Sequence, residues 1–452
     1  LLGYLCLEIR AVPGDRYLPK ILNPVVIASI GTYGCSMGAI LNFFVFADDY
    51  SCLDFGYVAP RVNQQVQYVH LAMTLACTSA VVTWTAFYTK LGEKAHYAYF
   101  SLIASSRFLR GRFAQNRLFI IVVAAIAVRL FLFRAGLHGR MVSSDAFDAA
   151  AEGYRTGTEY RHLGSLCYLV IVLTFIGHSR NPTPVNSMLR FVLLASEALF
   201  GFVYAARSAI VYPFLIAFIA QAYCERKIPR VALVLAGLSL IVALTVGNEF
   251  KHFGLEAGYR EEMGVFDLVS EFLTSRDRYA SGQSQTASIK AFVTSTSRNK
   301  SKVAECAAAI QFASKSGDDW FHDNAVSEFV MAPVHGFVPR SVSGVKRPAW
   351  GLNFKNLVLE RNVEARYSIG FSPIGFLFFA GGTIGVLFGA FCYGIVLKFT
   401  LLIARHGDIG FLLFVVLMSL FYDVHTVVPE SILNSVRYLI FLPFAFRVLF
   451  KG

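Results

Sequence analysis

The sequence predicts an all-α polytopic membrane protein with about 10–12 transmembrane helices. Hydrophobic residues make up 56% of the 452 residues and charged residues only 15%, and the mean hydropathy is +0.54. An ordinary soluble domain carries more charge than this. In addition, apolar runs such as "NPVVIASIGTYGCSMGAILNFFVF" and "RLFIIVVAAIAVRLFLF" are close to the roughly 20 residues that cross about 30 Å of hydrocarbon as a helix. Such runs recur along almost the whole chain.

One long polar region interrupts the expected spans. These spans are 21–46, 65–89, 117–136, 162–178, 187–204, 208–223, 230–247, 373–403, 409–422 and 431–450, with the remnant of another at the N-terminus. About 120 residues separate the span ending near Val246 from the one beginning near Pro373, too many for a plain connection. We therefore expect N-terminal transmembrane helices (1–247), a large structured loop (248–372) and C-terminal transmembrane helices (373–452).

The net charge is +12. The basic residues are distributed as the expected membrane topology requires, so we do not interpret them as a nucleic-acid surface and expect no nucleic-acid partner. Alternate connections hold most of the basic residues outside the loop, and the positive-inside rule places them in the cytoplasm. They are Arg10, Arg16, Lys20, Lys90, Lys94, Arg107, Arg110, Arg112, Arg117, Arg180, Arg190, Arg226, Lys227, Arg230, Lys398, Arg405, Arg447 and Lys451. This alternation places the loop 248–372 outside the cytoplasm.

Several segments of the loop have helical or helix-breaking patterns. In "MGVFDLVSEFLTSRDRYA", Phe266, Val269, Leu273 and Arg276 share one stripe, as in an amphipathic helix at an interface. "SKVAECAAAIQFASK" has high helix propensity, and "DDWFHDNAVSEFV" begins with aspartates suited to a first helical turn. The basic stretch "APVHGFVPRSVSGVKRP" (332–348) is expected not to form a continuous helix because of three prolines: Pro333, Pro339 and Pro348.

The outer side carries more arginines than the positive-inside rule predicts. Arg207 stands in a very short connection between two spans, in "YAARSAIVYPFLIAFI". A guanidinium pairs two phosphate oxygens through a planar fork and stays charged. A diphosphate outside the membrane would arrive on a lipid, so Arg207, Arg276 and Arg278 are candidate phosphate ligands. The alternative for a lone arginine at the end of a span is that it snorkels to the interface.

The stretch "FSPIGFLFFAGGTIGVLFGAFCYG" is rich in glycine. Gly381, Gly385 and Gly389 recur at four-residue spacing, which lets helices approach closely and indicates a packing role. The run 370–403 is too long for one span, so we expect a re-entrant or broken start, with Ser372-Pro373 as the break.

Metal and nucleophile motifs are missing from the sequence, which has no HExxH, no paired-cysteine spacing, no GxSxG and no phosphate-binding glycine loop. We therefore expect no metal and no nucleotide cofactor. His252, His322 and His335 fall in the outer region, where one of them could act as a general base near neutral pH. A structural role is the alternative for each.

Three landmarks follow one another between about residues 200 and 395. They are the arginine in the turn "AARSAIVYPFL", the segments "FLTSRDRYA" and "VPRSVSGVKRP", and the glycine-rich "GGTIGVLFGAFCYG". In this order they resemble the bacterial oligosaccharide repeat-unit polymerases, the O-antigen polymerase (Wzy-type) family. That family commonly has Gly-Ser-Arg in the turn and P-R-x-x-x-x-x-K-x-P in the loop. Here Ala-Ala precedes Arg207, and Arg347 stands between Lys346 and Pro348.

The resemblance implies a GT-C-like fold and polymerisation of undecaprenyl-diphosphate-linked glycans in the bacterial inner membrane, at a metal-independent active site on the periplasmic face. Donor and acceptor would both be lipid-linked, and a chain-length regulator is a possible partner. In this family a departing diphosphate needs cations, and an attacking hydroxyl needs a base. We expect His335 or a loop carboxylate to be the catalytic base, and a set of cations to bind the diphosphate: Arg207, Arg276, Arg278, Arg340, Lys346 and Arg347.

Other functions stay open. An O-antigen ligase would share the fold and donor and would pass the glycan to lipid A core or to protein; its reliance on a loop histidine suits His322 or His335. A transporter or flippase of lipid-linked sugars is disfavoured because the spans hold almost no acidic residue apart from Glu197 and show no doubled halves. A sensor or assembly scaffold would bind the lipid-linked glycan without turnover.

Overall fold

Helices account for nearly all regular structure in the described part of the chain. The computed structural model describes residues 19, 22–28, 77–78, 80–102, 112–113, 117–134, 167–203, 207–244, 246, 270–274, 319–337, 373–421 and 428–451. The main helices are α4 (Leu91–Leu102), α6 (Leu118–Arg134), Cys167–Arg180, α8 (Pro184–Val203), α9 (Arg207–Glu225), α10 (Arg230–Leu244), α15 (Asp319–Phe337), α18 (Pro373–Ile403), α19 (Gly407–Phe421) and α20 (Val428–Leu449).

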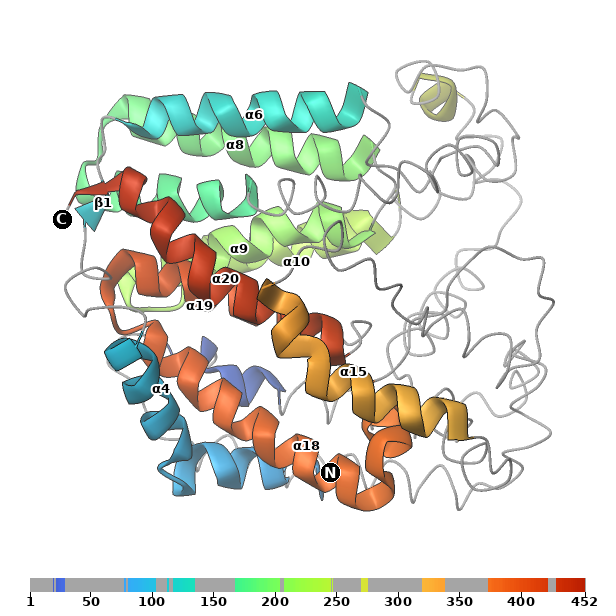
Figure 1. The fold of residues 1–452 in the computed structure, drawn as a ribbon. Helices are drawn as coiled ribbons and strands as arrows, with labels where there is room; N and C mark the ends of the chain where they lie inside the picture. The colour runs from blue at the N-terminus through green and yellow to red at the C-terminus, as the bar shows by residue number, and fades with distance from the viewer. Residues whose placement is uncertain are drawn as a thin grey trace.

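A small antiparallel ladder is the one departure from the predicted all-α class among these residues. β1 (Arg112–Phe113) pairs with β2 (Phe450–Lys451), with Arg112 opposite Lys451. The ladder lies beside the C-terminus in Figure 1 and ties the last residues of the chain to the connection before α6. Both strands belong to connections that the sequence places on one side of the membrane.

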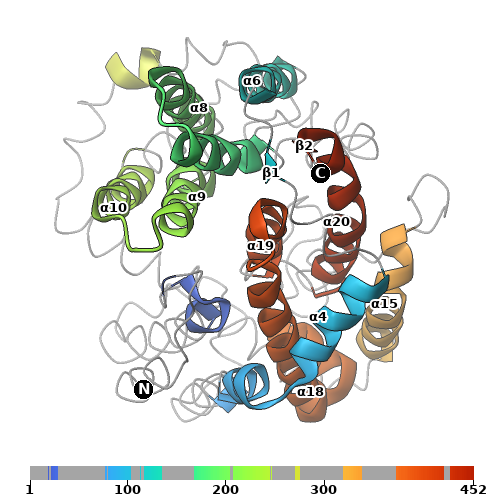
Figure 2. The ribbon, with the colours of Figure 1, turned by 90° about the vertical axis from the view of Figure 1, so that its left-hand side faces the viewer.

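The long helices form two groups that pack side by side. In the first, α6 packs on α8, α8 on α9, and α9 on α10. In the second, α19 contacts α18 and α20, and α4 lies on α18 (Figure 2). Tyr223 of α9 stacks on Phe411 of α19, with ring centroids 3.7 Å apart, and the helix Cys167–Arg180 contributes Leu173 and Ile176 to the same core. Apolar contacts of this kind join the two groups.

From residue 117 onward, each expected span has a described helix at nearly the same residues. Among the described residues, α18 alone is both long and apolar enough to cross a membrane. Shorter apolar helices occur at Leu118–Leu132, Cys167–Arg180, Ile210–Glu225, Arg230–Val242 and Gly407–Met418.

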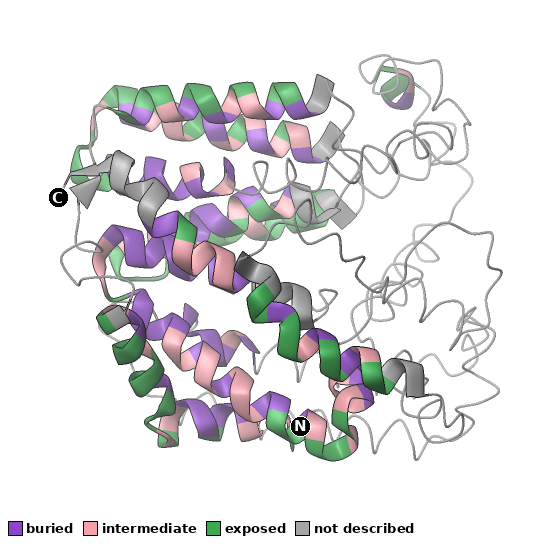
Figure 3. Ribbon diagram, in the orientation of Figure 1, coloured by how far each residue is buried: buried purple, intermediate pink, exposed green. Residues whose placement is uncertain are grey.

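The outer faces of several helices are exposed (Figure 3) and carry large apolar side chains. On α10, most of the large aliphatic side chains are more than a third exposed; they are Val231, Leu233, Val234, Leu235, Leu238, Leu240, Ile241 and Val242. The outer faces of α6 and α8 similarly expose Phe119, Ile120, Met188 and Phe191. Soluble monomers rarely expose apolar patches of this extent.

Helix α18 is broken, as expected, but at a different place from the predicted Ser372-Pro373. Pro373 begins the helix, and the backbone leaves the helical conformation at Gly381 and Gly382. Gly382 has φ of 58° and ψ of −148°, a combination that is essentially restricted to glycine. Proline is tolerated in a first helical turn, where its missing N–H has no helical partner. The glycine pair, rather than the proline, therefore produces the break.

The glycines that follow the break let the chain fold back on itself. A Cβ atom at Gly385 would lie 2.3 Å from the backbone oxygen of Leu377, and one at Gly389 would lie 2.4 Å from the Leu377 Cδ1 atom. The expected packing role is thus confirmed for these two glycines, with the first segment of α18 itself as the partner. Gly381 has no such neighbour, so it serves the break rather than the contact.

Pro333 does not interrupt the helix, and the expectation that 332–348 is not one continuous helix rests mostly on residues outside the described part of the chain. Helix α15 passes through Pro333 and ends at Phe337, inside the stretch 332–348. Pro333 lies on the exposed side of α15, whereas Ala325, Glu328 and Ala332 are buried where the helix packs on α18 and α20. That burial offsets the cost of about 3 kcal/mol for an internal proline. Pro339 and Pro348 lie outside the described residues.

The expected interfacial helix in the loop is described only at residues 270–274, which are helical. Phe272 is buried, and Leu273, a member of the predicted stripe, is 62% exposed. Phe266, Val269 and Arg276 lie outside the described residues, as does "SKVAECAAAIQFASK". The helix expected from "DDWFHDNAVSEFV" is confirmed, because α15 begins at Asp319.

The fold-back of α18 predicts unequal responses to leucine at two helical glycines. Gly385→Leu should lower stability by about 1–3 kcal/mol, since its Cβ would overlap a backbone oxygen that cannot move alone. Gly237→Leu in α10 should be tolerated, because nothing lies within 4 Å of a Cβ there. Thermal melting of the purified variants in detergent, followed by far-UV circular dichroism, measures both. Equal melting temperatures would contradict the fold-back.

Candidate functional site

A histidine of the loop helix α15 forms a hydrogen bond to α18 beside its break. His322, near the start of α15, places its Nδ1 atom 3.1 Å from the backbone oxygen of Phe379. In a continuous helix that oxygen would accept the N–H of Thr383, which lies beyond the break at Gly381 and Gly382. A carbonyl oxygen can only accept, so Nδ1 carries the proton and donates. The helix α15 is thereby attached to α18 at the point where the backbone of α18 is irregular.

This hydrogen bond has a chemical consequence for His322. In the neutral ring, a protonated Nδ1 leaves Nε2 as the acceptor. The residue as a whole is exposed, and Nε2 is the ring nitrogen that remains to accept a hydrogen bond from a hydroxyl group. A histidine whose tautomer is held by a backbone carbonyl, with the other nitrogen left as the acceptor, has the arrangement of a general base.

The predicted site residues are only partly described. Arg207 is the first residue of α9, and three residues separate it from the end of α8 at Val203, so the very short connection is confirmed. His335 lies in the last turn of α15. The structure describes the backbone of both and the side chain of neither. The remaining predicted phosphate ligands, Arg276, Arg278, Arg340, Lys346 and Arg347, lie outside the described residues.

Helix geometry separates the two loop histidines. His322 and His335 are thirteen residues apart on α15, which corresponds to roughly 20 Å at 1.5 Å per residue. The two rings are therefore too far apart to act in one reaction centre. Only one of the two histidines can be the base of a given site. Position 335 lies seven residues after Glu328, on the helical face whose members at 325, 328 and 332 are buried.

Glu328 is a functional candidate that sequence reasoning did not single out. Its side chain comes from the loop, yet the residue is only 8% exposed and lies on the face of α15 that packs against α18 and α20. The sequence shows a glutamate in a helical, mostly polar segment, which by itself indicates a solvated position. Only the docking of α15 distinguishes Glu328 from the other loop carboxylates.

A buried ion pair connects α6 and α8. Arg129 Nε donates to both carboxylate oxygens of Glu197, at 2.8 and 2.9 Å, and Nη2 donates to Oε2 at 2.5 Å. The guanidinium carbon also lies 4.8 Å from the centre of the Tyr168 ring. The two charged residues are 4% and 2% exposed. Three hydrogen bonds and an aromatic face thus compensate the charges in an apolar environment.

Sequence reasoning noted Glu197 and missed Arg129. The available signal was that each is a lone ionisable residue inside an apolar run, of opposite sign to the other. Charged residues in such runs usually face the interior of a helix bundle and pair with one another. The pairing partner could have been named from that rule, whereas the contact of Arg129 with Tyr168 required the packed structure.

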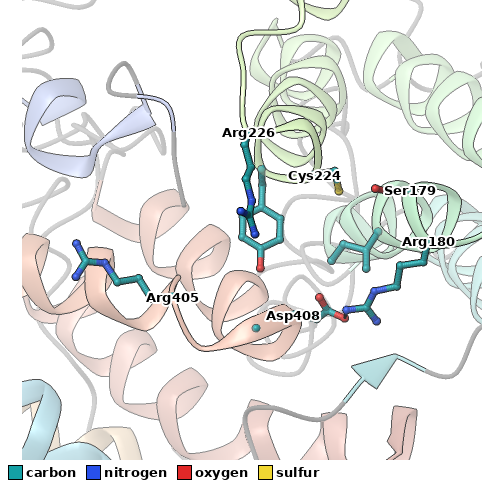
Figure 4. Close-up of a pocket in the computed structure, with 9 residues that line it drawn as sticks. Ser179, Arg180, Cys224, Arg226, Arg405 and Asp408 are labelled. Atoms are coloured by element: carbon teal, nitrogen blue, oxygen red, sulfur yellow. Dashed lines mark ion pairs between the residues drawn. The ribbon is translucent and has the colours of Figure 1, made fainter. Parts of the chain in front are cut away.

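A cavity of about 360 Å³ opens at the opposite end of the bundle from Arg207 (Figure 4). Its lining comes from three connections that the sequence places in the cytoplasm: Ile176, Ser179, Arg180, Tyr223, Cys224, Arg226, Arg405, Gly407 and Asp408. Arg180 Nη2 lies 2.5 Å from Asp408 Oδ2. Because α9 runs from Arg207 to Glu225, the two ends of the bundle are roughly 27 Å apart.

A histidine pair lies beside this cavity, at the α18–α19 turn. His96 of α4 and His406 have their Nε2 atoms 2.8 Å apart, so one ring donates and the other accepts. Phe100 packs against both rings, with centroids 4.6 and 4.1 Å away. Burial, and to a smaller extent the nearby His406 and Arg405, together lower the pKa of His96 to about 4. His96 is therefore neutral at pH 7.

Comparisons with models of protein families, with curated protein sequences and with solved structures found no match to this chain. Among the described residues, no group of three His, Cys, Asp or Glu side chains is placed to hold a metal ion.

The buried ion pair predicts non-additive effects of substitution. Glu197→Ala should destabilise the protein by about 3–5 kcal/mol, because Arg129 would stay buried without its partner. The double variant Arg129→Met/Glu197→Met should recover most of that loss. Glu225→Gln, at an exposed helix end, is the matched control and should have little effect. Melting temperatures in detergent measure all three, and a double variant as unstable as Glu197→Ala would argue against the pair.

The histidine pair predicts a stability that falls in acid. The folded pKa of His96, about 4, lies below the unfolded value of about 6.5, so the unfolded chain binds the proton more readily. The contribution of His96 to the free energy of unfolding is therefore fully present above about pH 6.5 and is lost as the pH falls toward 4. His96→Phe should flatten the melting temperature between pH 7 and 4.5, whereas Lys94→Gln, exposed on the same helix, should not. Parallel pH profiles of parent and His96→Phe would contradict this assignment.

Proposed function

We propose that the protein is a polytopic membrane glycosyltransferase with a GT-C-like fold. It polymerises undecaprenyl-diphosphate-linked oligosaccharide repeat units on the periplasmic face of the bacterial inner membrane. The exposed apolar faces of α6, α8 and α10 support the membrane placement, because a lipid environment removes the cost of exposing them to water. The convergence of connections 179–180, 223–226 and 405–408 at one end supports the alternating topology, because the positive-inside rule assigns all three to one side.

The observation that carries the proposal is the broken start of α18 with His322 attached to it. Irregular backbone within a membrane-embedded bundle is tolerated where protein or a water-filled cavity covers it. Such discontinuous helices commonly form substrate sites in membrane proteins. From Gly382 to Ile403 the second segment of α18 extends roughly 30 Å, so the break lies at the end opposite Arg405, on the proposed periplasmic side.

The mechanism assigns cations to the leaving group and a base to the nucleophile. Arg207, Arg276 and Arg278 hold the departing undecaprenyl diphosphate, and Arg340, Lys346 and Arg347 close over it. The base removes a proton from the acceptor hydroxyl as its oxygen attacks the anomeric carbon and the bond to the diphosphate oxygen breaks. Attack opposite the leaving group inverts the configuration. His335 is the proposed base, and Glu328 is the described loop carboxylate that lies on the same helical face.

The second candidate is an O-antigen ligase, and the hydrogen bond of His322 favours it. A ligase relies on a loop histidine as base, and His322 has Nδ1 held by Phe379 and Nε2 left as the acceptor. The donor would be the same lipid-linked glycan, and the acceptor would be lipid A core or protein. The glycan profile of a deletion strain separates the two: loss of a polymerase leaves single repeat units attached, and loss of a ligase leaves none.

Transport of lipid-linked sugars is a weaker proposal. Glu197, the acidic residue within the expected spans, is paired with Arg129 through three hydrogen bonds and is 2% exposed. A carboxylate that couples transport must exchange protons or ions with water along a pathway. Glu197 is better suited to holding α6 and α8 together.

Substitution of Arg207 tests the proposed function. In a deletion strain complemented with Arg207→Ala or Arg207→Lys, long glycan chains should be lost while single repeat units remain, because a point-charge lysine does not replace the guanidinium fork. Lys227→Gln, which removes a positive charge at the other end of α9, is the matched control and should keep the ladder of chain lengths. Immunoblots must show equal protein levels. An unchanged ladder in both Arg207 variants would refute the assignment.

A further inference from the structure

Helix α15 has the reverse of the polarity expected of a helix in a water-exposed loop. Its buried face carries a carboxylate, because Glu328 is 8% exposed and shares that face with the buried Ala325 and Ala332. Its outer face carries large apolar side chains that are at least 40% exposed (Figure 3): Val326, Val330, Met331 and Val334. A helix packed on a protein in water turns its apolar side chains inward and its charges outward. The opposite arrangement is expected where the outer face meets hydrocarbon.

Charge on the outer face of α15 is confined to the beginning of the helix. Asp323 is exposed and lies seven residues before Val330, so the two share one face. From residue 324 to 337 the sequence has one carboxylate, that of the buried Glu328, and no lysine or arginine. The other exposed residues of this part, Ser327 and Pro333, are uncharged. The outer face therefore begins polar and continues apolar, as expected of a segment that enters lipid from water.

The start of α15 lies at the outer end of the long second segment of α18. His322 donates to the carbonyl of Phe379, beside the break. From Gly382 to Ile403 α18 extends roughly 30 Å, which is the thickness of the hydrocarbon core. From this level α15 packs along α18 and α20 instead of leaving the bundle (Figure 1). The distance along the axis from His322 to Val334 is roughly 18 Å, enough to reach the middle of a bilayer and too short to cross it.

The surface of α18 at the same level is also apolar. Ile384, Leu387 and Phe388 follow the break within two turns, and all three side chains are exposed. Because α15 is attached to α18 at the break and packs on it, these side chains lie at the level where α15 begins. Two neighbouring helices thus expose large apolar side chains near one end of the bundle. Soluble proteins rarely expose surface of this kind, whereas helices in contact with lipid do so regularly.

The position of Glu328 fits a helix at membrane depth. Acidic residues there face the interior of the helix bundle instead of the lipid. Glu328 lies on the face of α15 that packs against α18 and α20. The pair of Arg129 and Glu197 follows the same rule elsewhere in the molecule, because both side chains are buried between helices.

We infer that α15 re-enters the membrane from the periplasmic side, and that its outer face contacts the acyl chains of phospholipids in the periplasmic leaflet. Val326, Val330 and Val334 face these chains. Asp323 lies at the level of the headgroups, and Glu328 faces α18 and α20. The inference rests on the membrane placement in the proposed function and does not depend on glycosyl transfer. It assigns residues 319–337, expected in an aqueous loop, to the membrane-embedded part of the protein.

Photo-crosslinking to lipid tests this contact in the full-length chain without any substitution. The purified protein is reconstituted in vesicles containing a phospholipid with a diazirine in the middle of one acyl chain, illuminated, digested and sequenced by mass spectrometry. Adducts should occur on the outer face of α15 at a level similar to that on Val234 and Leu238, which are exposed on α10, and much less on Lys94 of α4. Adducts on α10 without adducts on α15 would overturn the inference and leave the proposed function standing. No adducts on either helix would overturn the membrane placement and with it both proposals.

A charge on the outer face of α15 provides the second test. Val330→Asp should lower the melting temperature in nanodiscs by several degrees, because a carboxylate would have to enter hydrocarbon. Ala98→Asp, at an exposed position of α4 in an expected connection, is the matched control and should change it little. An unchanged melting temperature in Val330→Asp would show that the outer face meets water, and the inference would be wrong. A large loss in Val330→Asp without lipid adducts on α15 would also overturn it, because another protein segment or a second copy would then cover this face.

Discussion

The fold-back of α18 is the contact on which the outer end of the molecule depends. Two glycines, Gly385 and Gly389, leave room for Leu377 against the helix backbone, and Gly382 takes a conformation that side chains disfavour. The first segment of α18 can therefore turn back close to the Phe379 carbonyl. His322 donates to that carbonyl, which attaches α15 and positions the loop histidine. A glycine spacing within one helix thus determines where a separate loop helix docks.

The two ends of the bundle and its middle differ in how their charged side chains are compensated. At the proposed periplasmic end, the loop is expected to supply the cations that bind the diphosphate of the lipid-linked glycan. At the other end, Arg180, Arg226 and Arg405 line a cavity whose single aspartate neutralises one of them. Between the ends, Arg129 and Glu197 pair through three hydrogen bonds within apolar helices. The charged side chains of the described helices thus lie mostly at the ends, where water is accessible, and the pair in the apolar middle is hydrogen-bonded.

The break in α18 and the course of α15 show how far local patterns predict this fold. The excess length of the run 370–403 correctly predicted an irregular start, but its position was wrong, because proline is harmless in a first turn while a glycine pair in a helix interior is not. Proline is disfavoured inside a helix, yet α15 continues through Pro333 to Phe337. Burial of Ala325, Glu328 and Ala332 against neighbouring helices outweighed that local preference, and burial depends on partners distant in the sequence.

By itself, the sequence determined most of the apolar helices from residue 117 onward, because they follow from composition within single runs of residues, whereas α4 lies in an expected connection and was not predicted. It also placed Arg207 in a short connection between two helices. Only the tertiary structure decided which groups meet: Arg129 with Glu197, His322 with the Phe379 carbonyl, and His96 with His406. Each of these contacts joins residues more than fifty positions apart, and such pairings are set by helix packing rather than by any local pattern.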